Sequence, residues 1–187
     1  MASLDKVLQI QEKASKLQFQ YWQEEVYLSP QWWFLLFSLM APWFLFWLLF
    51  DRNQAFRTWI VGLFIMLTSF FLDEVGASFQ LWEYPYTLTP LEREVFDPAN
   101  FTLLPIVYML VYQYTRSWKG YLISLIFVAL FNTYIGGGLF RLIGAYELVT
   151  WKSIYSVPIY YLLGVLARYF VQCLKKSEHQ NKTSSST

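Results

Sequence analysis

Long stretches without a single charged residue constrain this chain more than any other feature of its sequence. The clearest runs from Trp32 to Phe50, and its 19 residues are all uncharged. A helix needs about 20 predominantly apolar residues to cross the hydrocarbon core of a bilayer. Because that core offers no water to hydrogen-bond the backbone, each span is expected to be helical.

Four more apolar stretches follow, and together they predict about five transmembrane helices. The stretch that begins near residue 98 is preceded by Asp97, and Asp97-Pro98 is typical of a helix start. Aspartate caps the first turn, and proline has no N–H that would need a partner there. The spans predicted after the first cover about residues 57–77, 98–114, 118–140 and 153–174. The predicted fold class is therefore an all-α, polytopic transmembrane helix bundle.

Composition supports the same class. Of the 187 residues, 56% are hydrophobic, 21% are aromatic and 14% are charged, whereas soluble domains carry about 25% charged residues. These values exclude an ordinary soluble enzyme and a disordered chain. The net charge of +1 also argues against a nucleic-acid partner. The expected partners are the lipid bilayer and either a second copy of the chain or another membrane protein.

The two ends of the chain differ from the middle and divide it into three segments: residues 1–30, the transmembrane domain 31–174 and a polar tail 175–187 that is expected to be disordered. In the first segment, apolar residues recur at helical spacing, at Val7, Ile10, Ala14, Leu17 and Tyr21. This spacing predicts an amphipathic helix. Such a helix lies along the membrane surface or packs against a partner chain.

Basic residues near the predicted span ends are distributed unevenly, which predicts the orientation of the chain. Seven lie on the side of the C-terminus: Arg52, Arg57, Arg116, Lys119, Lys175, Lys176 and Lys182. Three lie close to a span on the other side: Arg93, Arg141 and Lys152. The positive-inside rule therefore places the N-terminus outside and the C-terminus inside.

The loop after the second span is acidic. Six acids and one arginine lie between Asp73 and Asp97. One interpretation is a site for a cation or cationic solute at the outer mouth, with Asp73 and Glu74 as first candidates, since acids at the edge of a span are costly unless they face water or a partner. The other interpretation is a solvated loop. Successive helical residues point about 100° apart, so Asp73 and Glu74 cannot both face one small site.

Aromatic residues near the span ends are predicted to anchor the helices at the depth of the lipid headgroups. The predicted anchors are Trp82, Tyr84, Tyr86, Trp118 and Trp151. Arg168 lies two turns before the end of the last span, so its charged end is expected to extend to the same interface.

Polar residues in and after the fourth span are further candidates for a polar or ion-binding site. Asn132 lies within this span, and Arg141 and Glu147 flank its end. An ion pair between Arg141 and Glu147, or between Arg141 and Asp73, is one expectation. The other is that Arg141 extends to the membrane interface.

Three consecutive glycines, Gly136, Gly137 and Gly138, interrupt the same span. Small residues allow helices to approach closely, so the glycines predict helix packing. The alternative is a broken helix that lines a substrate cavity.

Residues required by common enzyme mechanisms are scarce. The single histidine, His179, lies in the polar tail, which excludes a histidine-based triad or a multi-histidine metal site. Cys173 is the single cysteine, so an internal disulfide and a zinc site of the CxxC kind are excluded too. Cys173 is expected to be a small buried residue. We therefore predict no catalytic residues, no metal and no cofactor.

Two stretches resemble a known family. The runs are LWEYPYTLTP, followed by FDPANFTLLPIVYMLVYQYTRSWKGY, and YELVTWKSIYSVPIYYLLGVLAR. They are similar to a group of small, uncharacterised multi-pass membrane proteins from endospore-forming bacteria of the Bacillus and Clostridium kind. The resemblance covers about residues 59–170 and implies a bacterial plasma membrane or spore membrane location, with no established activity. Many members have an acid followed by proline in the fourth span, where this chain has Asn132 and Thr133, so no residue role is carried over.

Three functions are compatible with the sequence. The favoured one is a non-enzymatic packing, scaffold or assembly component of the membrane, supported by the glycines and the amphipathic first segment. The alternative is a transporter or channel subunit for a cation or small solute that uses carboxylates at its outer mouth. The third is a membrane-embedded enzyme with a carboxylate-only mechanism.

Overall fold

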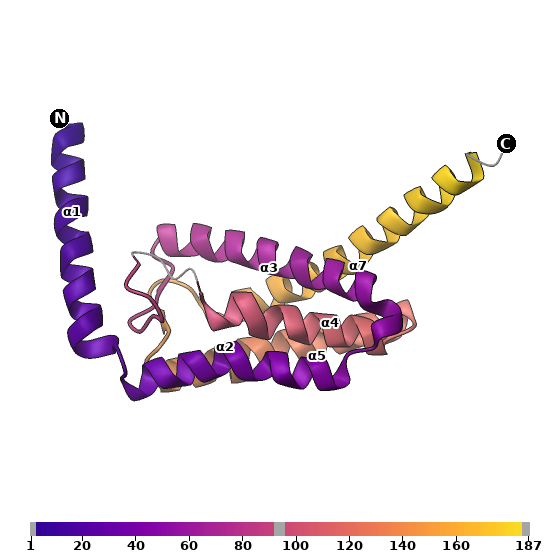
Figure 1. Ribbon diagram of the computed structural model, residues 1–187, viewed down its shortest axis with the longest axis horizontal. Coiled ribbons are helices and arrows are strands. Elements are labelled where there is room, and N and C mark those ends of the chain that lie inside the picture. Colours follow the sequence, from indigo (N-terminus) through magenta and orange to yellow (C-terminus); the bar gives the residue numbers. More distant parts are fainter. Residues whose placement is uncertain (1–2, 92–95, 185–187) are drawn as a thin grey trace.

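The computed structural model describes residues 3–91 and 96–184, with side chains as far as residue 177. It is an all-α bundle, as the sequence predicted (Figure 1). Its α-helices are α1 (Leu4–Tyr21), α2 (Pro30–Leu49), α3 (Ala55–Ser78), α4 (Leu104–Tyr114), α5 (Trp118–Leu130), α6 (Gly137–Leu142) and α7 (Ser153–Ser184). Shorter elements are the π-helical turns η1 (Trp22–Val26), η3 (Ala99–Leu103) and η4 (Phe131–Gly136), the 3₁₀ turn η2 (Arg52–Gln54), and the strands β1 (Trp82–Glu83) and β2 (Glu147–Leu148).

Among residues 3–91 and 96–184, four helices are long and apolar enough to cross a membrane. They cover Pro30–Leu49, Arg52–Ser78, Trp118–Leu142 and Ser153–Ser177. These agree with the first, second, fourth and fifth predicted spans, and they show that the chain is a membrane protein.

The predicted third span is a shorter, central helix. It consists of the five residues of η3 and the 11 residues of α4. Figure 1 shows α4 running along the bundle, and it contacts α2, α3 and α5. Tyr108 and Met109 on α4 are completely buried. Because its neighbours cover it, this helix is shielded from lipid over much of its surface and needs less apolar length than the outer ones.

The main core forms where α3, α4, α5 and α7 meet. It includes Val61 and Ile65 from α3, Tyr108 from α4 and Leu125 from α5. Gly164 on α7 allows the closest approach, since a Cβ atom added there would lie 2.4 Å from Leu125 and 2.8 Å from Tyr108. Tyrosine hydroxyls satisfy the polar backbone at this contact. Tyr121 donates to the Gly164 carbonyl at 2.8 Å, and Tyr108 donates to the Tyr160 carbonyl at 2.6 Å.

The prediction that the charged end of Arg168 extends to the membrane interface is wrong. The residue is buried, with 7% of its surface exposed. Its guanidinium donates to three backbone carbonyls of the α4–α5 turn, those of Thr115, Arg116 and Ser117, at 3.3, 2.9 and 3.3 Å. It also lies over the ring of Tyr121, 4.6 Å from its centroid. Carbonyl dipoles and aromatic faces stabilise a buried cation, so Arg168 holds this turn against α7.

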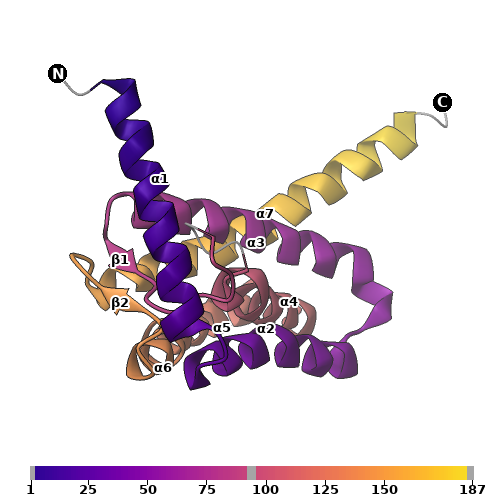
Figure 2. The same ribbon diagram turned by 60° about the vertical axis from the view of Figure 1, so that its left-hand side comes forward.

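The two ends of the bundle differ. At the end that we call the α1 end, α1 runs across the bundle rather than along it, and β1, β2 and α6 lie at the same end (Figure 2). The amphipathic α1 helix was predicted correctly, and none of its residues is buried. Two side chains tie this region to the following loop: Gln18 donates to the Leu91 carbonyl at 3.1 Å, and Trp22 donates to the Thr87 carbonyl at 3.0 Å.

At the opposite end, the α7 end, the last helix continues beyond the bundle (Figure 1). It reaches Ser184, whereas a disordered tail was expected from residue 175. No proline or glycine follows Lys175, so nothing in the backbone forces the helix to stop, and the expectation was wrong for residues 175–184. Residues 185–187 lie outside the described residues. Cys173, which was expected to be buried, is exposed on this helix.

Candidate functional site

A cluster of buried polar groups at the α1 end is the most distinctive site in the described part of the chain. It forms around Asp73, which lies one turn before the end of α3. One carboxylate oxygen of Asp73 accepts a hydrogen bond from the Trp82 indole at 2.9 Å and another from the Tyr84 hydroxyl. The side chain of Asn100 also hydrogen-bonds to Asp73. The acid at the edge of the second span is thus satisfied by the loop that follows it.

Asp97 supplies a second carboxylate to the same site. Asp97 is 3% exposed. Its carboxylate accepts hydrogen bonds from the backbone N–H groups of Ala99 and Asn100 at 3.3 and 2.8 Å. The prediction that Asp97 caps the following helix is confirmed. The Asn100 side chain bonds to Asp97 as well as to Asp73, so a single amide bridges the two acids. We call this arrangement the Asp73–Asp97 site.

The electrostatics of the site favour a bound proton. Burial and, second, the charge of Asp73 together raise the pKa of Asp97 from 3.8 to about 7, against the lowering effect of the hydrogen bonds from Asn100 and Ala99. Desolvation disfavours the charged form of an acid, and a neighbouring like charge acts in the same direction. Neither acid makes a salt bridge with a described lysine or arginine. The environment of the folded site therefore favours the protonated form of Asp97.

Three tyrosines surround the acids. The rings of Tyr84 and Tyr146 lie 5.4 Å apart, and Tyr160 of α7 is within electrostatic range of both carboxylates. Burial, followed by the charges of Asp73 and Asp97, raises the pKa of Tyr84 well above its ordinary value. Burial is also the main cause that raises the pKa of Tyr146. These phenols stay protonated and are available as hydrogen-bond donors.

The loop that contains β1 and the loop that contains β2 are hydrogen-bonded to each other beside the site. β1 pairs antiparallel with β2, with Trp82 opposite Leu148, and the Leu81 carbonyl accepts from the N–H groups of residues 149, 150 and 151. The indole of Trp82 packs edge-on against Trp151, with 5.5 Å between the ring centroids. Gly76 makes this arrangement possible, because a Cβ atom added there would lie 2.1 Å from the Trp82 ring.

The structure separates the residues predicted as one polar site. Asp73 belongs to the Asp73–Asp97 site, and Glu74 is half-buried beside it on α3. The ion pair expected for Arg141 does not form with Glu147 or Asp73, since Arg141 donates to the Gly137 carbonyl at 3.3 Å and Glu147 is exposed on β2. Both charged side chains are exposed at the surface and do not pair across the bundle.

Asn132 and its neighbour Thr133 lie in η4, away from the hydrogen bonds of the Asp73–Asp97 site. The Asn132 amide nitrogen and the Thr133 hydroxyl are buried, and within the described chain neither has a hydrogen-bond partner. Asn132 is therefore a candidate polar residue that the fold does not bring to the two acids.

Sequence reasoning missed Asp97 and Asn100 as site residues. The sequence predicts only a capping role for Asp97, because capping depends on residues next to it in the sequence. A signal was present in the run Asp-Pro-Ala-Asn, whose acid and amide are three residues apart and return to one side of a helical turn. Their meeting with Asp73 depends on the path of the intervening loop.

Predicted interface anchors point inward at this end of the bundle. The polar atoms of Trp82 and Tyr84 bond to Asp73, which corrects their assignment as headgroup anchors. Tyr86 packs against the cluster formed by Leu35, Phe140 and Ala145.

The other two predicted anchors are also bonded within the protein. The Trp118 indole donates to Gln172 at 3.2 Å, and the Trp151 indole donates to Ser156 at 3.0 Å. Both are half-buried, so they pack at helix ends while part of each ring stays accessible to the surroundings.

The glycines of the fourth span have no close contact with another described element. A Cβ atom added at Gly138 would meet no described atom within 4 Å, and at Gly136 and Gly137 the nearest atoms belong to the preceding turn, at 3.9 and 3.6 Å. The described part of the chain therefore does not supply the helix packing predicted for them.

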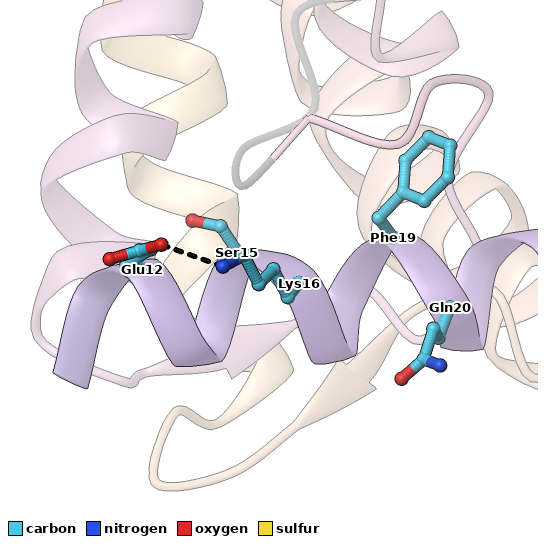
Figure 3. Close-up of a pocket in the computed structure, with 5 residues that line it drawn as sticks. All are labelled: Glu12, Ser15, Lys16, Phe19 and Gln20. Atoms are coloured by element: carbon cyan, nitrogen blue, oxygen red, sulfur yellow. Dashed lines mark hydrogen bonds and ion pairs between the residues drawn. The ribbon is translucent and has the colours of Figure 1, made fainter. Parts of the chain in front are cut away.

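A hollow on α1 does not form a site. Glu12, Ser15, Lys16, Phe19 and Gln20 line it. Figure 3 shows the ion pair between Glu12 and Lys16, 2.6 Å long, while Phe19 and Gln20 point to different sides of the helix. Its side chains do not converge on a common point.

The chain matches no protein family model, no curated protein sequence and no solved structure. The resemblance to membrane proteins of endospore-forming bacteria therefore stays a prediction, and the chemistry of the Asp73–Asp97 site rests on its geometry.

The raised pKa of Asp97 predicts how stability depends on pH. The unfolded chain releases this proton near pH 3.9, whereas the folded protein holds it up to about pH 7. Stability should therefore fall as the pH rises from about 4 to about 7 and then level off. Each unit of pKa difference is worth about 1.4 kcal/mol.

Asp97→Asn tests this expectation, because asparagine keeps the helix cap and removes the titrating acid. Thermal unfolding between pH 4 and pH 8 in a neutral detergent should show a much flatter profile for the variant. The matched control is Glu83→Gln, which removes an exposed acid from the same loop and should keep the wild-type slope. Equal slopes for Asp97→Asn and the wild type would contradict the assignment.

Proposed function

We propose that this chain is a multi-pass membrane protein that takes up and releases a proton at the Asp73–Asp97 site, as the cation-handling component of a membrane transport process. The observation that carries the proposal is the pair of carboxylates, half-buried at Asp73 and buried at Asp97, which shares the Asn100 amide and makes no salt bridge with a described basic residue. Ionisable residues at membrane depth commonly mark proton relays and ion pathways.

The hydrogen bonds at the site favour a proton over a metal ion. Metal ions such as Ca²⁺ and Mg²⁺ need oxygen lone pairs directed at them. Here an indole N–H and a phenol O–H both donate to one oxygen of Asp73, and two backbone N–H groups donate to Asp97. These donors occupy lone pairs that a metal would require, whereas a proton needs only one carboxylate oxygen.

The neighbouring phenols provide groups that can relay the proton. Tyr84 donates directly to Asp73, and its ring packs against Tyr146. Tyr160 extends the cluster to α7, one of the four long apolar helices. The site thus joins α3, the loop that contains β1, and the last span.

A second function, self-association of the bundle, is favoured by the open glycines. Gly136–Gly138 lie in a span long and apolar enough to cross the membrane, yet they contact no other described helix closely. Small residues that face outward in a bilayer allow another helix to approach. This is the packing or assembly role favoured by the sequence, and the two functions can coexist.

For the orientation, we propose that the Asp73–Asp97 site faces the outside of a bacterial plasma membrane or spore membrane. Arg52, Arg57, Lys119 and Lys175 belong to helices or turns at the α7 end, and Arg116 lies in the turn that joins α4 to α5 there. The positive-inside rule supports an inside location for that end, which puts α1 and the two acids outside.

Proton flux into proteoliposomes that contain an internal pH dye tests the main proposal. An imposed pH gradient should dissipate faster with the wild-type protein than in empty vesicles. Asp73→Asn and Asp97→Asn should each lower the protein-dependent rate at least about tenfold, the low end of what losing a positioned proton-transfer group costs. Glu83→Gln is the matched control and should transport as the wild type does. A wild-type rate equal to that of empty vesicles would refute the proposal.

Energy transfer between labelled copies in liposomes tests self-association. Gly138→Leu fills the open face and should reduce the transfer strongly, because the added side chain prevents close approach. Phe127→Leu changes a lipid-exposed position of α5 and serves as the control. Wild-type transfer no higher than expected for random mixing would exclude a self-associating role.

Labelling from outside intact cells tests the orientation. In a Cys173→Ser background, a cysteine introduced by Glu83→Cys on β1 should react with a membrane-impermeant maleimide, and one introduced by Lys119→Cys on α5 should react only after permeabilisation. Both positions are exposed. The reverse pattern would invert the proposed orientation.

A further inference from the structure

A groove at the α7 end lies between the start of α3 and the later part of α7. Its volume is about 520 Å³, and six residues line it: Phe56, Arg57, Ile60, Val171, Leu174 and Lys175. Figure 1 shows α3 and α7 passing each other in this part of the bundle, and the two helices are in contact. The groove is at the opposite end from the Asp73–Asp97 site, so the inference rests on the proposed orientation but not on proton transfer at that site.

The lining combines apolar walls with two cations and no acid. Phe56, Ile60, Val171 and Leu174 provide the apolar surface, and Arg57 and Lys175 are the basic residues. Both basic side chains are exposed. Neither forms a salt bridge with a described acid, so their charges are available to a ligand.

The two cations lie at the same membrane boundary. Arg57 comes early in the candidate span Arg52–Ser78, and Lys175 comes late in the candidate span Ser153–Ser177. The two spans run in opposite directions, so the start of one meets the end of the other (Figure 1). Charged residues at a span end lie at the depth of the lipid headgroups, while the apolar walls continue towards the hydrocarbon.

We propose that this groove binds an anionic phospholipid. The headgroup phosphate lies between Arg57 and Lys175, and an acyl chain follows the apolar side formed by Ile60 and Val171. Guanidinium and ammonium groups are the usual protein partners of phosphate, and basic pockets between transmembrane helices on the inner side bind anionic lipid headgroups. The lipid would hold the start of α3 against α7, where the last helix leaves the bundle.

Lipid retention measured by native mass spectrometry tests the proposal. The protein is taken from nanodiscs that contain phosphatidylglycerol and phosphatidylcholine in equal amounts. The wild-type protein should retain phosphatidylglycerol preferentially. The double variant Arg57→Gln/Lys175→Gln should bind it about thirtyfold more weakly, as expected from removing two cations at the headgroup surface.

The matched control is Arg52→Gln/Lys176→Gln, which removes two exposed cations from the same end without touching the groove lining. It should retain the lipid to within about twofold of the wild type, because charge outside the pocket acts only at longer range. Thermal unfolding in phosphatidylcholine alone should be equal for all three proteins, which establishes that the variants fold.

Three results would overturn the inference. Equal losses in the groove variant and its control would mean that the total charge of this end attracts lipid without a specific site. Equal retention of phosphatidylglycerol and phosphatidylcholine by the wild type would mean that the headgroup is not recognised. Displacement of the lipid by millimolar inorganic phosphate would mean that free anions, and not lipids, occupy the site.

Discussion

The placement of two acids, Asp73 half-buried and Asp97 buried, is the constraint on which the rest of the α1 end depends. A carboxylate at the edge of a membrane span cannot remain without partners. The chain supplies them from the following loop, which returns Trp82 and Tyr84 to Asp73 and brings Asn100 between Asp73 and Asp97. The loop is therefore ordered by polar bonds to a helix end, and the burial of Asp97 beside Asp73 raises the pKa of Asp97.

Near the α7 end, Arg168 is a buried charge that also needs polar partners. A single cation buried on α7 needs compensation, and the turn between α4 and α5 provides it through three carbonyl oxygens. The carbonyls at the end of a helix carry partial negative charge, so the turn and the arginine stabilise each other. Each end of the bundle is thus fastened by a buried charge that meets backbone or polar groups from a different part of the chain.

Between the ends, tyrosine hydroxyls and small residues replace larger polar networks. Tyr108 and Tyr121 donate to carbonyls of α7, and Gly164 lets α7 approach them closely. The aromatic excess of the sequence is therefore used partly inside the bundle. Gly138 lies outside these contacts and leaves an open face on the fourth span.

The sequence by itself determined the membrane class, the position of every long helix and the cap at Asp97. These features depend on local properties: uncharged length, the spacing of apolar residues, and the preference of aspartate for a helix start. A short-range pattern also predicted α1 correctly. The length of the last helix was underestimated because a polar composition does not by itself stop a helix.

Only the tertiary structure decided that Asp73 and Asp97 share one amide, that Trp82 points inward, and that Arg168 is buried. Each of these features depends on how closely two segments of the folded chain approach. Gly76 shows the reason most clearly, since the Trp82 ring occupies the space that a side chain would fill. Hydrophobic periodicity reports which face of a helix is apolar, but it carries no information on which distant loop returns to cover a buried charge.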